Sequence, residues 1–578
     1  MTYDLVIRGG TIVDGLGGEP YVGDVAVSGG VIRAVGTVTE PGDREIDATG
    51  LLVTPGFVDL HTHYDGQAIW SDRLNPSSAH GVTTAVMGNC GVGFAPCRPE
   101  DHETLVDVMA GVEDIPGVVM VDGLPWTWET FPEFLDALDA RRRDIDVAAF
   151  LPHSPLRVYV MGERGVNREP ATAEDLALMR KLASEAVEVG ALGFASSRLT
   201  IHKTESGQPI PSFDAAQAEI EAIARGVDDA GGGLIQFVPD LFATDYEQAL
   251  QSVFDAAAEV GLPVTFTLAI GNAGPPLHLD ALRMVEKANQ QAGADGPTVT
   301  AQIFPRPIGL VLGLGLSGHP FVLYPSYREL AHLPLAERVA EMRKPEVRER
   351  ILNDTPAGDG HPLMFAAQAF EWMFPLEDPP NYEPDRADSI AERARARGVS
   401  PLEEAYDRVL DDDGKAMLMV TLANFRDGSL DTVAELIHRD DVVLGLGDGG
   451  AHYGMICDAS FPTYMLTHWV RDRPEGRLSL AATVRELTSV PARVAGLGDR
   501  GRIAVGYKAD LNVIDAQELR LHRPVVVHDL PAGGRRLDQG ADGYVATIVS
   551  GEIIAENGVP TDARPGRLVR GRRPAPTG

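Results

Sequence analysis

The sequence predicts an α/β protein in which a (β/α)8 TIM-type barrel is joined by a small β-sandwich domain built from both termini. Eight short apolar runs alternate with stretches of helical period, as is typical of parallel strands linked by helices. Glycine-broken β runs gather at the two ends of the chain. Two histidines follow the first apolar run, where a barrel of this kind carries its functional side chains.

Length and charge narrow the classes of function. At 578 residues the chain is too long for one compact core. The 84 acidic residues outnumber the 50 basic ones and give a formal charge of −34, so neither nucleic acid nor a membrane is an expected partner. The chain shows no apolar run of about 18 residues and no leader at its start, so a cytoplasmic location is expected. Its three cysteines are too few and too scattered for a disulfide framework.

The eight expected barrel strands are recognised by short β-like runs that end near polar residues. In chain order they are GFVDLHTH, GVTTAVMGNC, DVAAFLPH, GALGFASS, GGLIQFV, PVTFTLAI, PTVTAQIF and VVLGLGDGG.

Helices are expected between these strands. In TAEDLALMRKLASEAVEVG, Thr172 and Asp175 have the spacing of an N-terminal capping box, and Gly190 is a typical stop. Similar helical periods occur in DAAQAEIEAIARGVDDAG, TDYEQALQSVFDAAAEVG and LHLDALRMVEKANQQAG, each directly before a strand.

The pattern also predicts the domain boundaries. The β runs of residues 1–55 and 497–578 are expected to pair into one sandwich, and residues 56–496 to form the barrel. The stretch of about 305–440 is far longer than a normal loop and is expected to be an insertion over the barrel mouth. The basic, proline-rich tail GRLVRGRRPAPTG is expected to be loosely ordered.

Several side chains with metal-binding chemistry fall at the predicted strand ends. His61 and His63 are two residues apart, so an extended strand directs both imidazoles to the same side. Cys90 ends the second strand, His153 the third and Asp448 the eighth. Each of these residues alone is most often structural, but together at one mouth they indicate a metal site.

A second motif points to a different function. Residues 313–318, GLGLSG, match the glycine pattern of dinucleotide-binding loops. The residues that follow, HPFVLYPSYREL, do not begin a helix at once, so the required βαβ context is missing and dinucleotide binding is not expected.

The motifs GLLVTPGFVDLHTHYD, GVTTAVMGNCGVGFAPC, GDGGAH and TSVPARVAGLGDRGRIAVGYKADLNVID resemble the amidohydrolase superfamily, specifically its D-aminoacylase (N-acyl-D-amino-acid deacylase) branch. The resemblance implies a metal-dependent hydrolase that cleaves a C–N amide bond, with His61, His63, Cys90 and Asp448 as metal ligands. Asp448 is then the catalytic group, which takes a proton from the attacking water and returns it to the leaving nitrogen.

The chain departs from that branch at two strands. The family carries histidines at the ends of strands five and six, whereas this chain has Gln236 and, on strand six, Thr265 and Thr267. One Zn²⁺ is therefore expected, with a second Zn²⁺ as the alternative.

The expected partner is a small-molecule amide substrate, and the sequence leaves open whether the chain forms a homo-oligomer. Candidate substrate-binding residues are His153, Arg198, His202, Lys203 and His452. No Arg or Lys closely follows Asp448 to hold a substrate carboxylate, so a cyclic amide or imide is an alternative substrate. A non-catalytic barrel scaffold that has lost metal ligands is the alternative outside enzymes.

Overall fold

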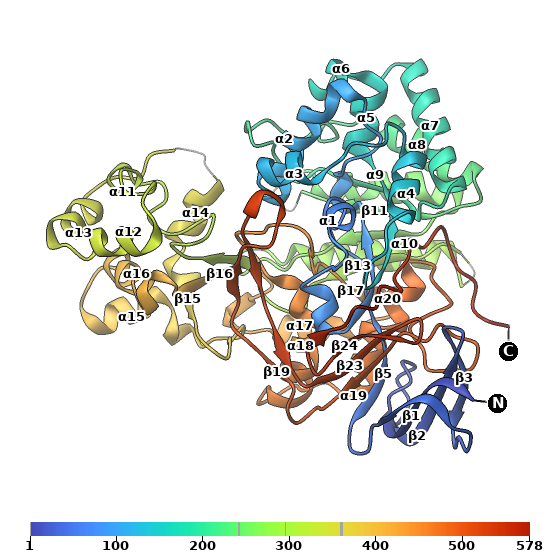
Figure 1. Cartoon of the computed structure of the whole chain (residues 1–578). Coiled ribbons are helices and arrows are strands. Elements are labelled where there is room, and N and C mark those ends of the chain that lie inside the picture. The colour runs from blue at the N-terminus through green and yellow to red at the C-terminus, as the bar shows by residue number, and fades with distance from the viewer. Residues whose placement is uncertain (1, 241–242, 295, 359–361, 578) are drawn as a thin grey trace.

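The structure is a computed structural model that describes residues 2–240, 243–294, 296–358 and 362–577. A central α/β region carries a sheet built from both ends of the chain on one side and a separate helical lobe on another (Figure 1). None of the helices in the described ranges is long and apolar enough to cross a membrane.

The α/β region is built on parallel strands that follow one another in chain order. The strands form two hydrogen-bonded sheets. One has three strands in the order β6-β7-β8, and the other has six strands in the order β9-β10-β11-β12-β13-β17. β8 and β9 are separated only by Phe150, whose N–H donates to the Met87 carbonyl, so the two sheets continue into each other. The strands are β6 (Phe57–Asp59), β7 (Val82–Met87), β8 (Asp146–Ala149), β9 (Leu151–Pro152), β10 (Gly193–Ser197), β11 (Leu234–Val238), β12 (Val264–Thr267), β13 (Val299–Ile303) and β17 (Val442–Leu444).

Helices connect these strands. The capping box predicted at Thr172 and Asp175 is confirmed: the Thr172 side chain accepts from the Asp175 N–H, and Asp175 accepts from the Thr172 N–H. This helix buries Met179, Ala183 and Ala186. The helices between the strands are α1 (Gln67–Trp70), α2 (His102–Glu113), α3 (Gly117–Gly123), α4 (Phe131–Asp139), α5 (His153–Met161), α6 (Glu163–Val166), α7 (Ala173–Glu188), α8 (Gln217–Asp229), α9 (Tyr246–Val260), α10 (Leu277–Ala292) and α17 (Asp431–Ile437); α18 (Phe461–Tyr464), the π-helix η9 (Met465–Asp472), α19 (Leu480–Leu487) and α20 (Ser489–Val494) follow β17.

The two ends of the chain are joined in one hydrogen-bonded sheet of nine strands, through the antiparallel pairing of β5 with β18. The ten-residue strand β1 is irregular between Ile7 and Gly10 and pairs with β2, β4 and β5 along its length. These strands enclose their own apolar core. The strands are β1 (Tyr3–Ile12), β2 (Tyr21–Ser28), β3 (Val31–Gly36), β4 (Gly42–Asp47), β5 (Leu52–Pro55), β18 (Leu511–Ile514), β23 (Tyr544–Val549), β24 (Glu552–Glu556) and β25 (Val559–Pro560).

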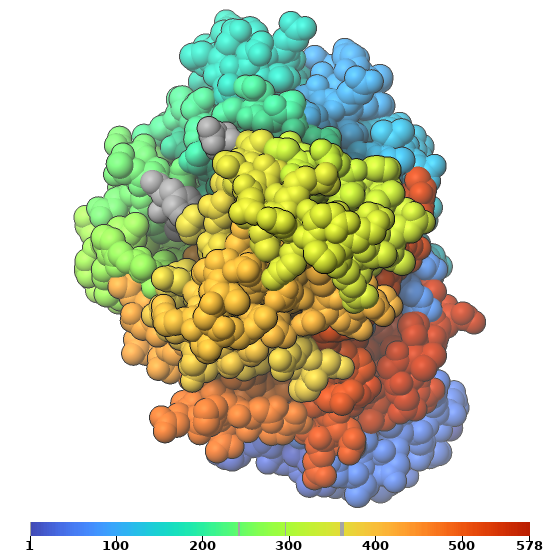
Figure 2. Space-filling view, turned by 90° about the vertical axis from the view of Figure 1, so that its left-hand side faces the viewer, coloured from blue at the N-terminus to red at the C-terminus, as the bar shows by residue number. Residues whose placement is uncertain are grey.

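The stretch between β13 and α17 forms a lobe with a core of its own, and this lobe faces the viewer in Figure 2. Its antiparallel sheet has the order β14-β16-β15. Residues 313–318 close a tight turn in which the Gly313 N–H donates to the Gly318 carbonyl. The strand before this turn, β14, pairs in antiparallel fashion with β16, so it does not belong to a parallel βαβ unit of the kind that binds dinucleotides. The elements are β14 (Ile308–Leu312), α11 (Pro325–Arg328), α12 (Leu335–Met342), α13 (Pro345–Leu352), α14 (Pro362–Gln368), β15 (Met373–Leu376), α15 (Ile390–Arg397), α16 (Pro401–Val409) and β16 (Met417–Ala423).

The expectation of a loosely ordered tail is wrong for its described part. The Val569 N–H donates to the Val147 carbonyl of β8, and the Gly571 N–H donates to the Gly190 carbonyl. Leu568 and Val569 are buried. Backbone pairing with β8 thus outweighs the proline-rich composition.

We expect the substitution Leu568→Ala to lower the free energy of unfolding by about 2–5 kcal/mol, because it opens a cavity between the tail and the strands. Thermal and denaturant unfolding measure the loss. Leu279→Ala on α10 is the control, because that side chain is 43% exposed and its loss should have little effect. Equal stabilities of the two variants would contradict the packing role of the tail.

Candidate metal centre

Loops that leave the carboxyl ends of three parallel strands bring four side chains together. His61 and His63 follow β6, Cys90 follows β7, and Asp448 follows β17. The His61 Nε2 lies 3.3 Å from the Cys90 Sγ, and the His63 Nε2 lies 3.8 Å from it. The Asp448 Oδ1 lies 3.6 Å from each of these two nitrogens. Both imidazoles therefore point to one place, as their spacing in an extended chain predicts.

These four donor atoms have the spacing of a metal's ligand shell. Zinc bonds of about 2.0–2.3 Å to nitrogen, oxygen and sulfur place neighbouring donors of a tetrahedron about 3.3–3.7 Å apart. His61, His63 and Cys90 also form a buried group whose donor atoms lie within 4.8 Å of one another. The donor set, two imidazoles with a thiol and a carboxylate, fits Zn²⁺ better than Mg²⁺ or Ca²⁺.

A neighbouring side chain orients the His61 imidazole, and a carboxylate lies beside that of His63. The His61 Nδ1–H donates to the Gln302 Oε1 of β13 at 2.9 Å, which leaves the lone pair on Nε2 facing the other donors. The His63 Nδ1 lies 3.3 Å from the Glu113 Oε1. Burial lowers the pKa of His61 to about 4 and that of His63 to about 3, so both rings are neutral and able to bind a metal near pH 7.

Burial also raises the pKa of the Cys90 thiol well above its usual value, with the carboxylates of Glu113 and Asp448 adding to the effect. A divalent cation at this position reverses that balance, because a coordinating thiol is deprotonated.

The backbone is strained at this centre. Cys90, Asp448 and His452 have φ of 56°, 46° and 48°, in the left-handed region that non-glycine residues seldom adopt. Glycine is required at position 447, directly before Asp448, because a Cβ there would lie 2.0 Å from the buried Asp59 Oδ2. Strain of this kind persists where the surrounding structure holds a functional geometry.

Two further residues at the centre were missed by sequence reasoning, Glu113 and Gln302. The Glu113 Oε2 lies 3.4 Å from the Nε2 of His452, so its carboxylate reaches both His452 and His63. Glu113 is the last residue of a helix and Gln302 lies inside a strand, and neither carries a motif that would single it out.

The five candidate substrate-binding residues lie in different places. His452 borders the centre, and His202 lies close enough to His61, His63 and His452 for their charges to affect its pKa, which burial lowers to about 3. The His202 Nδ1 bonds to the Ser197 Oγ. Lys203 continues the same loop, which packs on α2 at Gly111, where a Cβ would lie 2.3 Å from the Lys203 carbonyl oxygen.

The side chains of His153 and Arg198 have polar partners within the protein. The His153 Nδ1 bonds to the Ser196 Oγ, and its Nε2 lies 3.5 Å from the Glu219 carboxylate of α8. The Arg198 guanidinium donates to the Ala215 carbonyl. His153 thus contacts β10 and α8, and Arg198 contacts the segment between them.

Strands five and six supply neutral polar groups near the centre. The Gln236 Oε1 accepts from the Cys90 N–H at 3.0 Å. The Gln236 Nε2 and the hydroxyls of Thr265 and Thr267 are buried without a hydrogen-bond partner among the described residues. These positions hold amide and hydroxyl groups in place of imidazoles.

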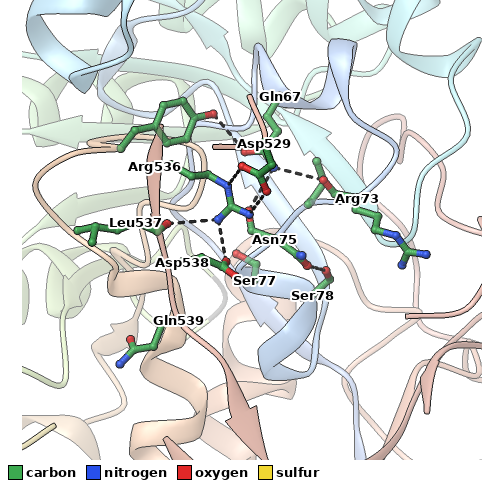
Figure 3. A network of polar contacts seen from close by, with 12 residues as sticks. Gln67, Arg73, Asn75, Ser77, Ser78, Asp529, Arg536, Leu537, Asp538 and Gln539 are labelled. Carbon is green, nitrogen blue, oxygen red and sulfur yellow. Dashed lines mark hydrogen bonds and ion pairs between the residues drawn. The ribbon is translucent and has the colours of Figure 1, made fainter. Parts of the chain in front are cut away.

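A polar network supports the loop that carries Asp448 and His452. The Tyr453 hydroxyl donates to the Gln67 Oε1, and the Tyr453 carbonyl accepts from the Leu537 N–H. Figure 3 shows the Arg536 guanidinium held by Asp529 and Asp538 beside this segment. The Gln67 amide in turn donates to the carbonyls of Arg73 and Asn75. The loop is therefore fixed from two sides.

Known proteins that resemble this chain over nearly its whole length include amidohydrolases. The amidohydrolase family matches residues 44–555. N-acyl-D-glutamate deacylase of Alcaligenes xylosoxydans xylosoxydans is 28% identical over 98% of this chain and 96% of its own. The structure of N-acyl-D-glutamate deacylase from Bordetella bronchiseptica, complexed with zinc and a phosphonate inhibitor, aligns with a TM-score of 0.65 at 23% identity over 99% of this chain and 100% of that chain.

A structure of D-aminoacylase, described by its binuclear metal centre with one-metal activation and second-metal attenuation, aligns with a TM-score of 0.64 at 23% identity over 98% of this chain and 100% of that one. The likeness to both structures shows an α/β fold of the TIM-barrel type with an extra domain. With the family match over most of its length, the chain is a metal-dependent hydrolase of C–N bonds other than peptide bonds and belongs to the amidohydrolase family.

Proposed function

We propose that this chain deacylates an N-acyl-D-amino acid at a centre that holds one Zn²⁺. The observation that carries the proposal is the convergence of His61, His63, Cys90 and Asp448, in which the thiol and the carboxylate lie 3.3 to 3.8 Å from the two imidazole nitrogens. The full-length relative named for N-acyl-D-glutamate supports the substrate class.

The residues present favour one metal over two. His61, His63 and Cys90 supply three protein ligands, which is the number a catalytic zinc with an open position uses. Gln236 and Thr265 are poor zinc ligands in the place of two histidines. When bound, zinc polarises a substrate carbonyl and lowers the pKa of water.

Asp448 is the proposed general base and acid. Its side chain is 20% exposed, so it reaches the open mouth while its Oδ1 stays near both imidazoles. From this place the carboxylate takes a proton from the attacking water and returns it to the leaving nitrogen. The Gln236 Nε2 and the Thr265 hydroxyl, both buried without a hydrogen-bond partner among the described residues, are available to orient the substrate.

The parallel strands are further proposed to close into an eight-stranded barrel around this centre. Two backbone hydrogen bonds support closure at the mouth: the Asp448 N–H donates to the His61 carbonyl, and the His63 N–H donates to the Gly449 carbonyl. They join the loop after β17 to the loop after β6.

We expect an N-acetyl-D-amino acid to be hydrolysed about 10–100-fold faster, in kcat/KM, than its methyl ester. Lys203 and His202, in the loop after β10, are proposed to meet the substrate's carboxylate, and a hydrogen bond to a charged group is worth about 1.5–3 kcal/mol. The variant Lys203→Met should remove most of the preference.

The N-acetyl-L enantiomer is the control for stereochemistry, and a cyclic imide tests the other substrate class. Equal rates for acid and ester would refute recognition of the carboxylate. Cleavage of the imide alone would refute the deacylase proposal in favour of a cyclic imide hydrolase. A well-folded chain that takes up no zinc would favour the non-catalytic scaffold.

A further inference from the structure

Glu113 is a buried carboxylate whose oxygens have no conventional partner. It ends α2 and is 1% exposed. Neither oxygen accepts a hydrogen bond of good geometry from the described residues. Two imidazoles lie beside the carboxylate: His63, at 3.3 Å through its Nδ1, and His452, at 3.4 Å through its Nε2.

The surrounding backbone holds Glu113 in this costly place. Gly111 lies against the loop after β10, where a Cβ would come within 2.1 Å of the Thr204 carbonyl carbon. The Asp114 Oδ2 accepts from the Ser317 Oγ and from the Gly454 N–H, each at 3.0 Å. The His452 N–H donates to the Glu113 carbonyl. Three segments of the mouth therefore fix the end of α2, and the carboxylate cannot turn to solvent.

Burying a charge without a full set of hydrogen bonds costs free energy, so a carboxylate in this position is expected to have a compensating partner. Glu219 is the contrasting case in the same chain. It is equally buried and lies 3.5 Å from the His153 Nε2, but it also forms an ion pair with Arg157 at 3.2 Å. Glu113 has no such cation among the residues the structure describes, and the place that would supply one is the metal centre on the far side of the His63 ring.

We propose that Glu113 is the positioning residue of the metal centre, taking the Nδ1–H of His63 and holding His452 at the rim. The inference rests on the metal site of the proposed function. A carboxylate on Nδ1 selects the tautomer whose lone pair is on Nε2, raises the basicity of that nitrogen and fixes the ring plane. The same carboxylate keeps His452 beside the mouth, opposite the ligands.

The test compares Glu113→Gln with Glu219→Gln. Both substitutions keep side-chain size and remove one buried carboxylate that lies next to a histidine. We expect Glu113→Gln to bind zinc about 10–100-fold more weakly, the range typical when the partner of a ligand is lost. Zinc content after dialysis against graded chelator measures the affinity, and the visible spectrum of the Co²⁺-loaded protein reports the ligand geometry.

The control separates positioning from stability. Glu219→Gln should lower the thermal unfolding temperature, because Arg157 loses its partner, yet keep the wild-type zinc affinity and Co²⁺ spectrum. Metal-free Glu113→Gln should unfold at no lower temperature than the metal-free wild type, while zinc should raise its unfolding temperature by less.

A Glu113→Gln variant with wild-type zinc affinity and Co²⁺ spectrum would overturn the proposal. So would an equal loss of affinity in Glu219→Gln. If Glu113→Gln does not fold, Glu113→Asp serves instead: its shorter carboxylate should weaken zinc binding and alter the Co²⁺ spectrum, and unchanged values would overturn the proposal. These readouts use no amide substrate, so they stand or fall independently of the deacylase activity.

Discussion

The variant Asp448→Asn should lose about 10²–10⁴-fold in kcat/KM toward its N-acyl substrate, because an amide cannot accept the proton of the attacking water. The change is nearly isosteric and the side chain is partly exposed, so the fold should persist. His61, His63 and Cys90 remain to hold the metal. The measurement is steady-state kinetics on protein whose zinc content is determined in the same sample.

Asp458→Asn is a control for removal of a nearby carboxylate. Asp458 is paired with the buried Arg306 at 2.6 Å and supplies none of the four donor atoms. Its loss should affect stability more than turnover per bound zinc. An Asp448→Asn protein that folds, keeps its zinc and retains full activity would exclude Asp448 as the general base.

The double variant His61→Ala, His63→Ala should lose its zinc and with it all metal-dependent activity. Wild-type protein is expected to carry about one zinc per chain. The double variant leaves only Cys90 and Asp448, fewer than the three protein ligands that a zinc site needs. Metal content by mass spectrometry, on protein purified without added metal, gives the number directly.

His278→Ala is the matched control, since it removes a buried imidazole from α10. It should keep wild-type zinc content. Two zinc ions per wild-type chain would mean that groups such as His202 or Glu113 complete a second site, and unchanged zinc content in the double variant would place the metal elsewhere.

The sequence predicted the parts of this centre that depend on local geometry. The alternation of side chains along an extended chain was enough to direct His61 and His63 to the same side. The carboxyl ends of parallel strands share one edge, which was enough to expect Cys90 and Asp448 beside them. The capping box at Thr172 and Asp175 was equally readable, because its contacts lie within three residues.

The partners of His153 and of the terminal strands could not be predicted from local sequence patterns. His153 ends its strand as the metal candidates do, yet it bonds to Ser196 and lies near Glu219, since the side on which a terminal residue turns depends on its neighbours. The sequence predicted that strands from both ends of the chain pair, but it did not give their partners: β5 pairs with β18, and β1 with β2, β4 and β5, a matter of register that no local pattern encodes. The tail pairs with β8 for the same reason.

The sequence by itself thus determined the family, the order of strands and helices, and the donors that stand at the strand ends. Only the tertiary structure decided what surrounds those donors. Gln302 lies 241 positions from its partner His61, and Glu113 lies 50 and 339 positions from His63 and His452. Contacts over such separations arise from packing of whole elements, and packing is decided by shape and burial rather than by any motif in the chain.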